Sequence, residues 1–106
     1  FSYLAKKAHD HGSRIYGATI MPCGNTEYSE KWMQAFEKTR RDVNQWIRTQ
    51  SVYDGYFDFD EILKNDTVPA YLKEEVHIGD GLHPNTMGGK ILAECVDLSM
   101  LTGLDD

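Results

Sequence analysis

The N-terminal part of the chain predicts the end of a helix followed by a buried strand. Leucine and alanine recur at a helical spacing within residues 1–11, and Gly12 follows as a stop signal. Residues 14–20 are mostly apolar, contain β-branched side chains, and are bounded by Gly12 and Pro22. Such a run is typical of a strand in the interior of a parallel sheet.

A long amphipathic helix is predicted from Ser29 to Gln50, with Ser29 as its N-cap. Its apolar positions lie within about 100° of one another on a helical wheel, and polar positions lie opposite. We expect the apolar stripe, with both tryptophans, to face the core; a ligand platform is the alternative for the tryptophans. The apolar side consists of Trp32, Phe36, Thr39, Val43, Trp46 and Ile47. The polar side consists of Glu30, Glu37, Arg41, Asn44 and Arg48.

The second half of the chain repeats the alternation of strand and helix. A short strand is predicted at 56–59, and a final helix is predicted over about 86–101 with Asn85 as its cap. Residues 60–76 predict short helical turns and loop, and residues 77–85 (HIGDGLHPN) predict a loop with two glycines and a proline.

This order of elements favours an α/β fold with a parallel sheet. Two strands alone would both be edges, and the apolar run 14–20 is expected to have neighbours on both sides. We therefore expect residues 1–106 to form the C-terminal portion of a single larger α/β domain. If the chain is stable by itself, we expect its open sheet edge to be covered, for example by self-association with another copy.

Charge and cysteine content exclude several classes of function. The 106 residues carry a formal net charge of −6, whereas a general nucleic-acid binder presents a basic face. No apolar stretch approaches the roughly 20 residues of a transmembrane helix. Cys23 and Cys95 are far apart and form no CxxC pattern, so we expect neither a disulfide scaffold nor a thiolate zinc site. We expect no cofactor and no metal.

The loop after the second strand contains an aspartate three residues before a histidine. Ligands of open parallel sheets bind beyond the carboxyl ends of the strands, where this loop lies. The Asp80 carboxylate can accept the proton on Nδ1 of His83, which leaves Nε2 as a base toward a hydroxyl nucleophile. On spacing alone, a surface histidine with Asp80 as a turn former is the simpler interpretation.

A wider pattern favours the catalytic interpretation. It consists, in order, of 18–22 (ATIMP), 57–59 (FDF), 68–73 (VPAYLK), 79–85 (GDGLHPN), Gly88 or Gly89, and Ala93. Over roughly residues 10–98, this order resembles the C-terminal block of the SGNH hydrolases, also called GDSL esterases and lipases. The segment DGLHPN with its following glycine is the specific part of the resemblance.

The resemblance implies a flavodoxin-like three-layer α/β/α sandwich and ester hydrolysis through an acyl-enzyme. Carried over, His83 is the general base and Asp80 its orienting acid. The family also needs a serine in a GDS motif, a glycine, and an asparagine in a GxND motif. None of these motifs is in the sequence. Because the nucleophile and two oxyanion donors are the largest catalytic contributions, we expect the isolated chain to be inactive.

We expect the full-length protein to be an esterase acting on a small acyl ester, with acetylated carbohydrate as one substrate class. The resemblance is compatible with a secreted or periplasmic protein, and the sequence leaves the compartment open. The first alternative is a non-catalytic α/β binding module that retains the family's C-terminal block. The second is an unrelated α/β domain such as a nucleotide binder, although no glycine-rich phosphate loop follows the first strand.

The loop after the first strand supplies the candidate substrate-binding residues Pro22, Cys23 and Gly24. Cys23 has no evident base, so we expect it to line the pocket rather than to act as a nucleophile. His77 is expected to be a loop residue rather than a second base or a metal ligand. Asp58 and Asp60 are competing candidates for the carboxylate partner of His83, and His9 and His11 are candidate metal ligands. For all four residues we favour a structural or surface role.

Overall fold

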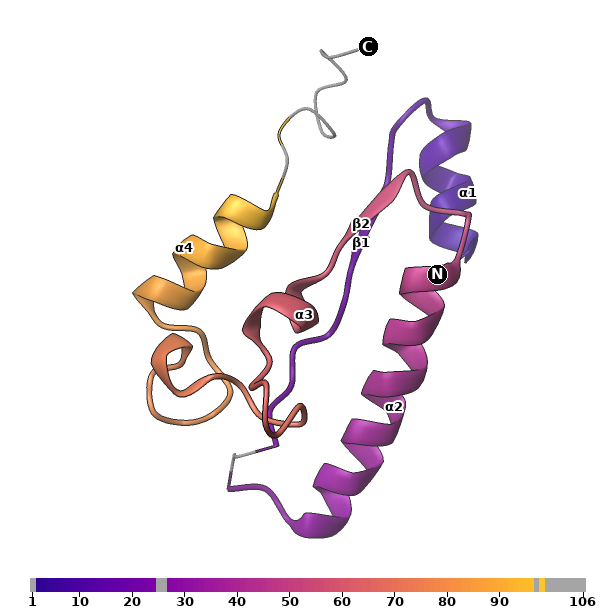
Figure 1. Cartoon of the computed structure of the whole chain (residues 1–106). Helices are drawn as coiled ribbons and strands as arrows, with labels where there is room; N and C mark the ends of the chain where they lie inside the picture. Colours follow the sequence, from indigo (N-terminus) through magenta and orange to yellow (C-terminus); the bar gives the residue numbers. More distant parts are fainter. Residues whose placement is uncertain (1, 25–26, 97, 99–106) are drawn as a thin grey trace.

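The computed structural model describes residues 2–24, 27–96 and 98, which form a mixed α/β arrangement (Figure 1). The element order confirms the predicted alternation of helix and strand. The elements are α1 (Ser2–Asp10), β1 (Tyr16–Ala18), α2 (Glu30–Thr49), β2 (Gly55–Phe57), α3 (Phe59–Leu63), the 3₁₀ helix η1 (Glu74–Val76) and α4 (Thr86–Cys95).

The two strands are parallel, as predicted, and Gly17 is paired with Tyr56 at the centre of the register. Both strands are shorter than the sequence suggested. Strand β2 stops at Phe57 because the Asp58 side chain accepts the backbone N–H of Glu61 and caps α3. Beyond the end of β1, the backbone N–H of Ile20 bonds to a side chain of α2 instead of extending the ladder.

Helices lie on both sides of the strand pair. Figure 1 shows α1 and α2 on one side and α4 on the other, with α3 following directly from β2. The core on the α4 side is a cluster of Leu63, Leu72 and Val76, against which Ile91 and Leu92 of α4 pack. On the other side, Ile47 of α2 lies against Gly17 of β1. Within the described residues, no helix has both the length and the apolar character needed to cross a membrane.

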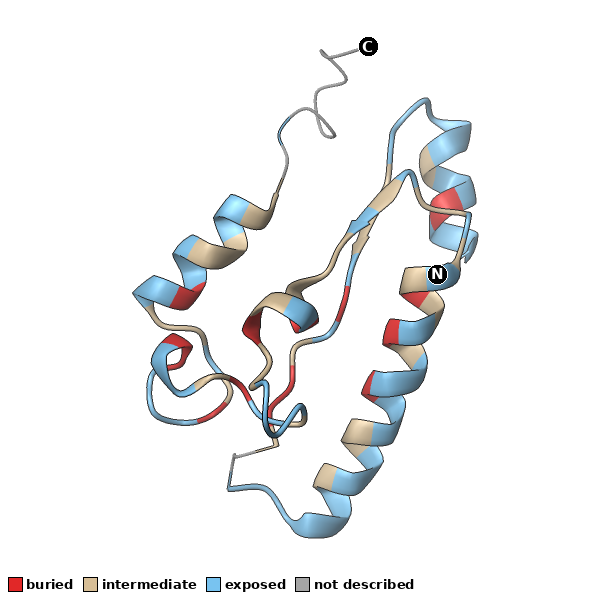
Figure 2. Cartoon of the chain, in the orientation of Figure 1, coloured by how far each residue is buried: buried red, intermediate tan, exposed pale blue. Residues whose placement is uncertain are grey.

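The face that α2 buries differs from the predicted one. The buried residues of this helix are Arg40, Asn44 and Ile47 (Figure 2), although Asn44 was expected on the solvent side. The physical reason is that polar groups at the end of β1 need partners: the Asn44 side chain bonds both the N–H and the C=O of Ile20, at 2.7 and 2.9 Å. Satisfying these groups decides the rotation of the helix.

The predicted burial of both tryptophans is wrong for Trp32. Its surface is 43% exposed, and its ring stacks on Phe36 with 5.2 Å between centroids. Tyr28, itself 53% exposed, lies against the same indole. Trp46 is half-buried and meets Tyr53 edge-on. The aromatic stripe of α2 is therefore partly on the surface at its N-terminal end.

Both predicted helix caps are confirmed. The Ser29 hydroxyl accepts the N–H of Trp32 at the start of α2, and the Asn85 side chain accepts the N–H of Gly88 at the start of α4. Helix α4 ends at Cys95 with Val96 as its C-cap. Most of the predicted continuation to residue 101 lies outside the described residues.

Candidate acid–base site

The Asp80 and His83 side chains are in direct contact. The Nδ1 atom of His83 lies 2.6 Å from Oδ2 of Asp80, and the other carboxylate oxygen accepts the backbone N–H groups of Leu82 and His83, both at 2.9 Å. The carboxylate therefore closes a tight turn on itself and holds the imidazole in one orientation. The structure brings together the two residues that the sequence nominated as catalytic.

This geometry defines the protonation of the pair. The hydrogen bond from His83, followed by the two backbone amides, holds the pKa of Asp80 well below its usual range, so the carboxylate is ionised near neutral pH. An ionised carboxylate only accepts, so the proton in the 2.6 Å contact sits on Nδ1 of His83. Nε2 is then the basic nitrogen. The His83 side chain is 67% exposed, and Nε2 bonds to no other described residue.

The loop around the pair, 77–85, lies at the end of the sheet toward which both strands run (Figure 1). Its glycines allow the sharp path: Gly79 and Gly81 have φ values of +106° and +70°, a region that side chains with a Cβ rarely adopt. The loop closes on itself where the N–H of Ile78 donates to the carbonyl of His83 at 3.0 Å. The pair is thus carried by a short, internally bonded turn.

Asn85 and Gly88 attach this loop to the body of the protein. The Asn85 amide nitrogen donates to the carbonyls of Glu75 and His77, while its oxygen caps α4. A Cβ added to Gly88 would collide with the carbonyl oxygen of Val76, whereas Gly89 has open space around it. Gly88 is therefore the glycine of the sequence motif that the fold requires.

His77 is a buried loop residue, and its role was not evident from the sequence. Its Nδ1 accepts the backbone N–H groups of Gly79 and Gly81, at 3.0 and 3.1 Å. Aspartate and asparagine are the residues known for bonding backbone amides two residues ahead, so a histidine in this position gives little sequence signal. Within the described residues, no group of three His, Cys, Asp or Glu side chains is placed to hold a metal ion.

The candidate substrate-binding residues are largely buried, and one of them contacts the loop that precedes η1. Pro22 and Cys23 are buried, and the N–H of Gly24 donates to the carbonyl of Ala70 at 2.7 Å. Burial, the largest influence, raises the pKa of the Cys23 thiol, which keeps it protonated near neutral pH and unsuited to nucleophilic attack. Of the three candidates, Gly24 alone lines the cavity described next.

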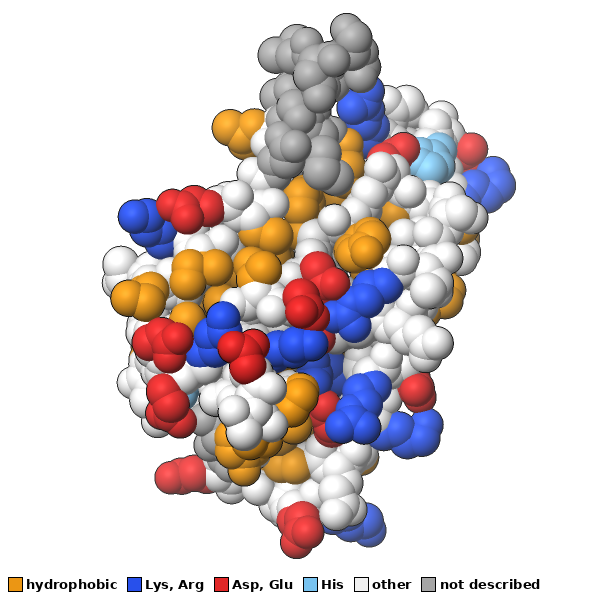
Figure 3. Space-filling model, in the orientation of Figure 1, with side chains coloured by type: hydrophobic (Ala, Val, Ile, Leu, Met, Phe, Trp, Pro, Cys, Tyr) orange, Lys and Arg blue, Asp and Glu red, His pale blue; other side chains and the backbone are white. Residues whose placement is uncertain are grey.

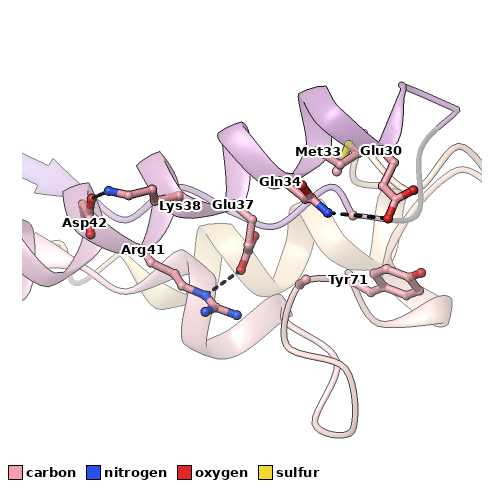
Figure 4. Close-up of a pocket in the computed structure, with 10 residues that line it drawn as sticks. Glu30, Met33, Gln34, Glu37, Lys38, Arg41, Asp42 and Tyr71 are labelled. Carbon is pink, nitrogen blue, oxygen red and sulfur yellow. Dashed lines mark hydrogen bonds and ion pairs between the residues drawn. The ribbon is translucent and has the colours of Figure 1, made fainter.

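An open cavity of about 570 Å³ lies between the N-terminal half of α2 and residues 70–71 (Figure 4). Its charged wall is paired within itself: Lys38 contacts Asp42 at 2.9 Å and Arg41 contacts Glu37 at 3.2 Å. Neither member of the acid–base pair lines it. The cavity is therefore separate from the candidate site.

The two other aspartates considered as partners of His83 belong to a network of arginines. Arg48 donates to Asp58 through Nε and Nη2, each at 2.8 Å, and to Asp60 at 2.9 Å. Buried Arg40 also contacts Asp60 and bonds Glu37 at 2.6 and 2.8 Å. Figure 3 shows acidic and basic side chains side by side over α3 and the adjoining part of α2.

This arginine network fixes the polar ends of both strands. The Thr19 hydroxyl donates to Asp58 at 2.8 Å and accepts the N–H of Asp60 at 2.9 Å, which ties the end of β1 to the start of α3. The hydrogen bonds from Arg48 are the largest influence on Asp58 and lower the pKa of its carboxyl. The network was not predicted, because its members lie far apart in the sequence.

The two N-terminal histidines have local partners. Nε2 of His9 contacts Asp54 at 2.9 Å, and Nδ1 of His11 bonds the carbonyl of Lys7 at 2.8 Å. These contacts tie α1 to the turn before β2 and close the end of the helix, respectively.

Comparison with known proteins adds no assignment to this geometry. No protein-family model matches the chain, and no curated protein matches it significantly.

Proposed function

We propose that the chain carries the acid–base part of a serine esterase of the SGNH type, and that residues 1–106 form the C-terminal portion of its flavodoxin-like α/β/α sandwich. The observation that carries the proposal is the 2.6 Å contact between Asp80 and His83, which occupies Nδ1 and leaves an exposed Nε2 as the base. Parallel strands with helices on both sides are the arrangement that the sandwich requires.

The chemistry of such a pair is general-base activation of a hydroxyl. As a serine oxygen bonds to the ester carbonyl carbon, its proton passes to Nε2 of His83, and Asp80 stabilises the resulting imidazolium without accepting the proton. The imidazolium then gives the proton to the departing alcohol as its C–O bond breaks. A water molecule repeats the sequence on the acyl-enzyme, releasing the acid and the free serine.

The nucleophile and the oxyanion donors would come from the remainder of the domain. Within the described residues, no serine hydroxyl hydrogen-bonds to His83, in accord with a nucleophile supplied from elsewhere. We propose a small acyl ester as substrate, with acetylated carbohydrate as one class, and a secreted or periplasmic full-length protein. The isolated chain is then inactive.

The same proposal accounts for the surfaces left open by the described residues. The sheet has two strands, and Trp32 of α2 is 43% exposed. We propose that the remaining strands of the sandwich cover these surfaces in the full domain, and that the isolated chain covers them by self-association. Sedimentation of the chain at increasing concentration tests the second part: a monomer throughout a hundredfold range would contradict it.

The test of the function uses a longer protein that includes the upstream segment. On p-nitrophenyl acetate, we expect Asp80→Asn to lower kcat/KM by about 10⁴-fold and His83→Ala to lower it by about 10⁶-fold, as for the corresponding members of a Ser-His-Asp triad. His11→Ala removes an exposed histidine just after the end of α1 and serves as the matched control with unchanged activity. A fluorophosphonate probe should label a serine of the longer protein.

Two results would contradict the proposal. One is turnover by the 106-residue chain that survives loss of His83. The other is a longer protein that folds but neither hydrolyses esters nor reacts with the probe, which would favour the non-catalytic binding module instead.

A further inference from the structure

The His77 ring lies at the inner side of the turn that carries Asp80. Its side chain is 5% exposed, and its Nδ1 accepts the amides of Gly79 and Gly81, the two residues that flank Asp80. Both glycines have positive φ, so the backbone curls around this one ring nitrogen. One acceptor thus orients the backbone on both sides of the candidate orienting acid.

The two bonds also fix the tautomer of His77. A ring nitrogen that accepts hydrogen bonds carries no proton, so the neutral ring holds its proton on Nε2. That nitrogen is buried without a hydrogen-bonding partner among the described protein atoms, and the carboxylate of Glu74 is 3.9 Å away. Buried donors are rarely left unpaired, so the cost of the unpaired Nε2 is expected to be offset by other interactions of the ring. The two bonds at Nδ1 supply it.

His77 and Asp80 divide the amides of the turn between them. His77 takes the N–H groups of Gly79 and Gly81, and Asp80 takes those of Leu82 and His83. The inner acceptor therefore sets the path of the backbone from which the Asp80 carboxylate reaches His83. Without it, the turn loses two of its bonds at the residues that adjoin Asp80.

We propose that His77 is a positioning residue of the Asp80–His83 pair: its unprotonated Nδ1 holds the turn in the shape that keeps the two side chains in contact. Its importance for catalysis rests on the proposed function, whereas its effect on the geometry of the pair does not. His77 itself touches neither a substrate nor a reacting atom. It acts through the backbone around Asp80.

The test compares two amides of nearly the same chemistry. In His77→Asn, the side-chain oxygen is as many bonds from Cα as Nδ1 is, so it can accept the same two N–H groups. In His77→Gln, the oxygen is one bond farther out and misses them. We expect amide exchange of Gly79 and Gly81 to stay within about threefold of the parent in His77→Asn and to rise about tenfold in His77→Gln.

Nitrogen-15 NMR of the 106-residue chain reads the pair directly. In the parent and in His77→Asn, we expect His83 to carry its proton on Nδ1, with the hydrogen-bonded proton shifted downfield. In His77→Gln, this proton signal should weaken as His83 samples both tautomers. Unchanged exchange at both glycines and an unchanged His83 signal in His77→Gln would overturn the proposal.

A measurement on the parent chain covers the case in which His77→Gln does not fold. The His77 ring must show a bare Nδ1 and a protonated Nε2; a proton on Nδ1 would overturn the proposal without any variant. In the longer protein, His77→Gln should lower kcat about 10–100-fold with KM unchanged, and His77→Asn should restore it. If neither form hydrolyses esters while the NMR differences hold, the proposed function fails and the positioning role of His77 stands.

Discussion

Two polar clusters lie near the carboxyl ends of the strands, and they are built in opposite ways. The turn around Asp80 and His83 is exposed, and its two side chains are three residues apart. The arginine network is buried at Arg40 and Asp60, and its longest connections join residues 20 and 41 positions apart, namely Arg40 with Asp60 and Thr19 with the backbone of Asp60. The first cluster is therefore arranged for access and the second for stability.

The energetics follow the same division. An exposed carboxylate and imidazole are screened by solvent, so their contact contributes little to folding and serves to orient the ring. In the arginine network, burial is the largest influence on Arg40 and opposes its charge, but the hydrogen bonds that Arg40 donates to Glu37 and Asp60, with the charges of these carboxylates, outweigh burial and raise the pKa of the guanidinium. Burial is also the largest influence on Glu37, yet the arginines lower its pKa. The charges of the network therefore depend on one another.

Removing Arg40 should have the largest effect on folding. Arg40→Met takes the shared guanidinium away from buried Asp60 and half-buried Glu37, which keep only Arg48 and Arg41, respectively, and this costs about 3 kcal/mol of unfolding free energy. Arg41→Met is the matched control on the same helix: Arg41 is 71% exposed and shares only Glu37, so about 0–1 kcal/mol is expected. Urea unfolding followed by circular dichroism measures both, and equal losses would contradict the assignment of the network to stability.

The contrast explains what the sequence could predict. The caps at Ser29 and Asn85 and the pair at Asp80 and His83 are local patterns, and the structure shows each contact. The buried face of α2 was misplaced because Asn44 and Arg40 face groups on other segments, and no local pattern announces such partners. A polar residue on a helix is expected to face solvent only when no polar group elsewhere in the fold needs it as a hydrogen-bond partner.

The pattern at Asp80 and His83 had the same limit. The spacing allowed contact between Asp80 and His83, and the wider resemblance favoured it, but neither predicted that the His77 ring would accept the amides of Gly79 and Gly81 in the same turn. Whether Pro22, Cys23 and Gly24 contact a substrate stays a prediction. The position of Gly24 depends on a hydrogen bond to Ala70, which is about 45 residues farther along the chain and which no local pattern indicates.

Gly88 offers the next largest effect, at the junction between the turn and the body. Gly88→Ala places a methyl group against the carbonyl of Val76, and the forced shift should destabilise the chain by about 1–3 kcal/mol. Gly89→Ala is its neighbour in the same helix with open space around it, so better helix propensity should stabilise the chain by about 0.5–1 kcal/mol. The midpoint temperature of unfolding should fall in Gly88→Ala and rise in Gly89→Ala. Shifts of the same sign in both variants would contradict the close approach of the Val76 carbonyl to Gly88.

The two confirmed caps differ in how much they connect. Asn85→Ala removes the cap of α4 and two bonds to the carbonyls of Glu75 and His77, so we expect a loss of about 1–2 kcal/mol. Ser29→Ala removes one exposed bond at the start of α2, with a loss of about 0.5–1 kcal/mol. Chemical unfolding measures both variants. A larger loss at Ser29 would show that Asn85 does not anchor the turn.

The smallest expected effect on folding, and the sharpest on the site, is the titration of Asp80. Its folded pKa is lowered, first by the His83 side chain and then by two backbone amides. Any stability that the carboxylate contributes is therefore complete above the unfolded pKa of about 3.9 and is lost only as pH falls through the lower folded value. A loss of ester hydrolysis between pH 5 and 7 would then have a cause other than protonation of Asp80.

Carbon-13 NMR of the Asp80 carboxyl in the 106-residue chain tests this ordering of causes. In the parent, the signal should stay that of an ionised carboxylate at pH 3. In His83→Ala, the His83 side chain, which is the largest cause of the lowered pKa, is gone while the two backbone amides remain. The titration midpoint of Asp80 should therefore rise yet stay below about 3.9. Two results would mean that the carboxylate does not hold the imidazole in solution: an Asp80 titration midpoint near the unfolded value of about 3.9 in the parent, or a midpoint that is the same in the parent and in His83→Ala. The exposed cluster would then lack the preorganisation that distinguishes a catalytic pair from a surface turn.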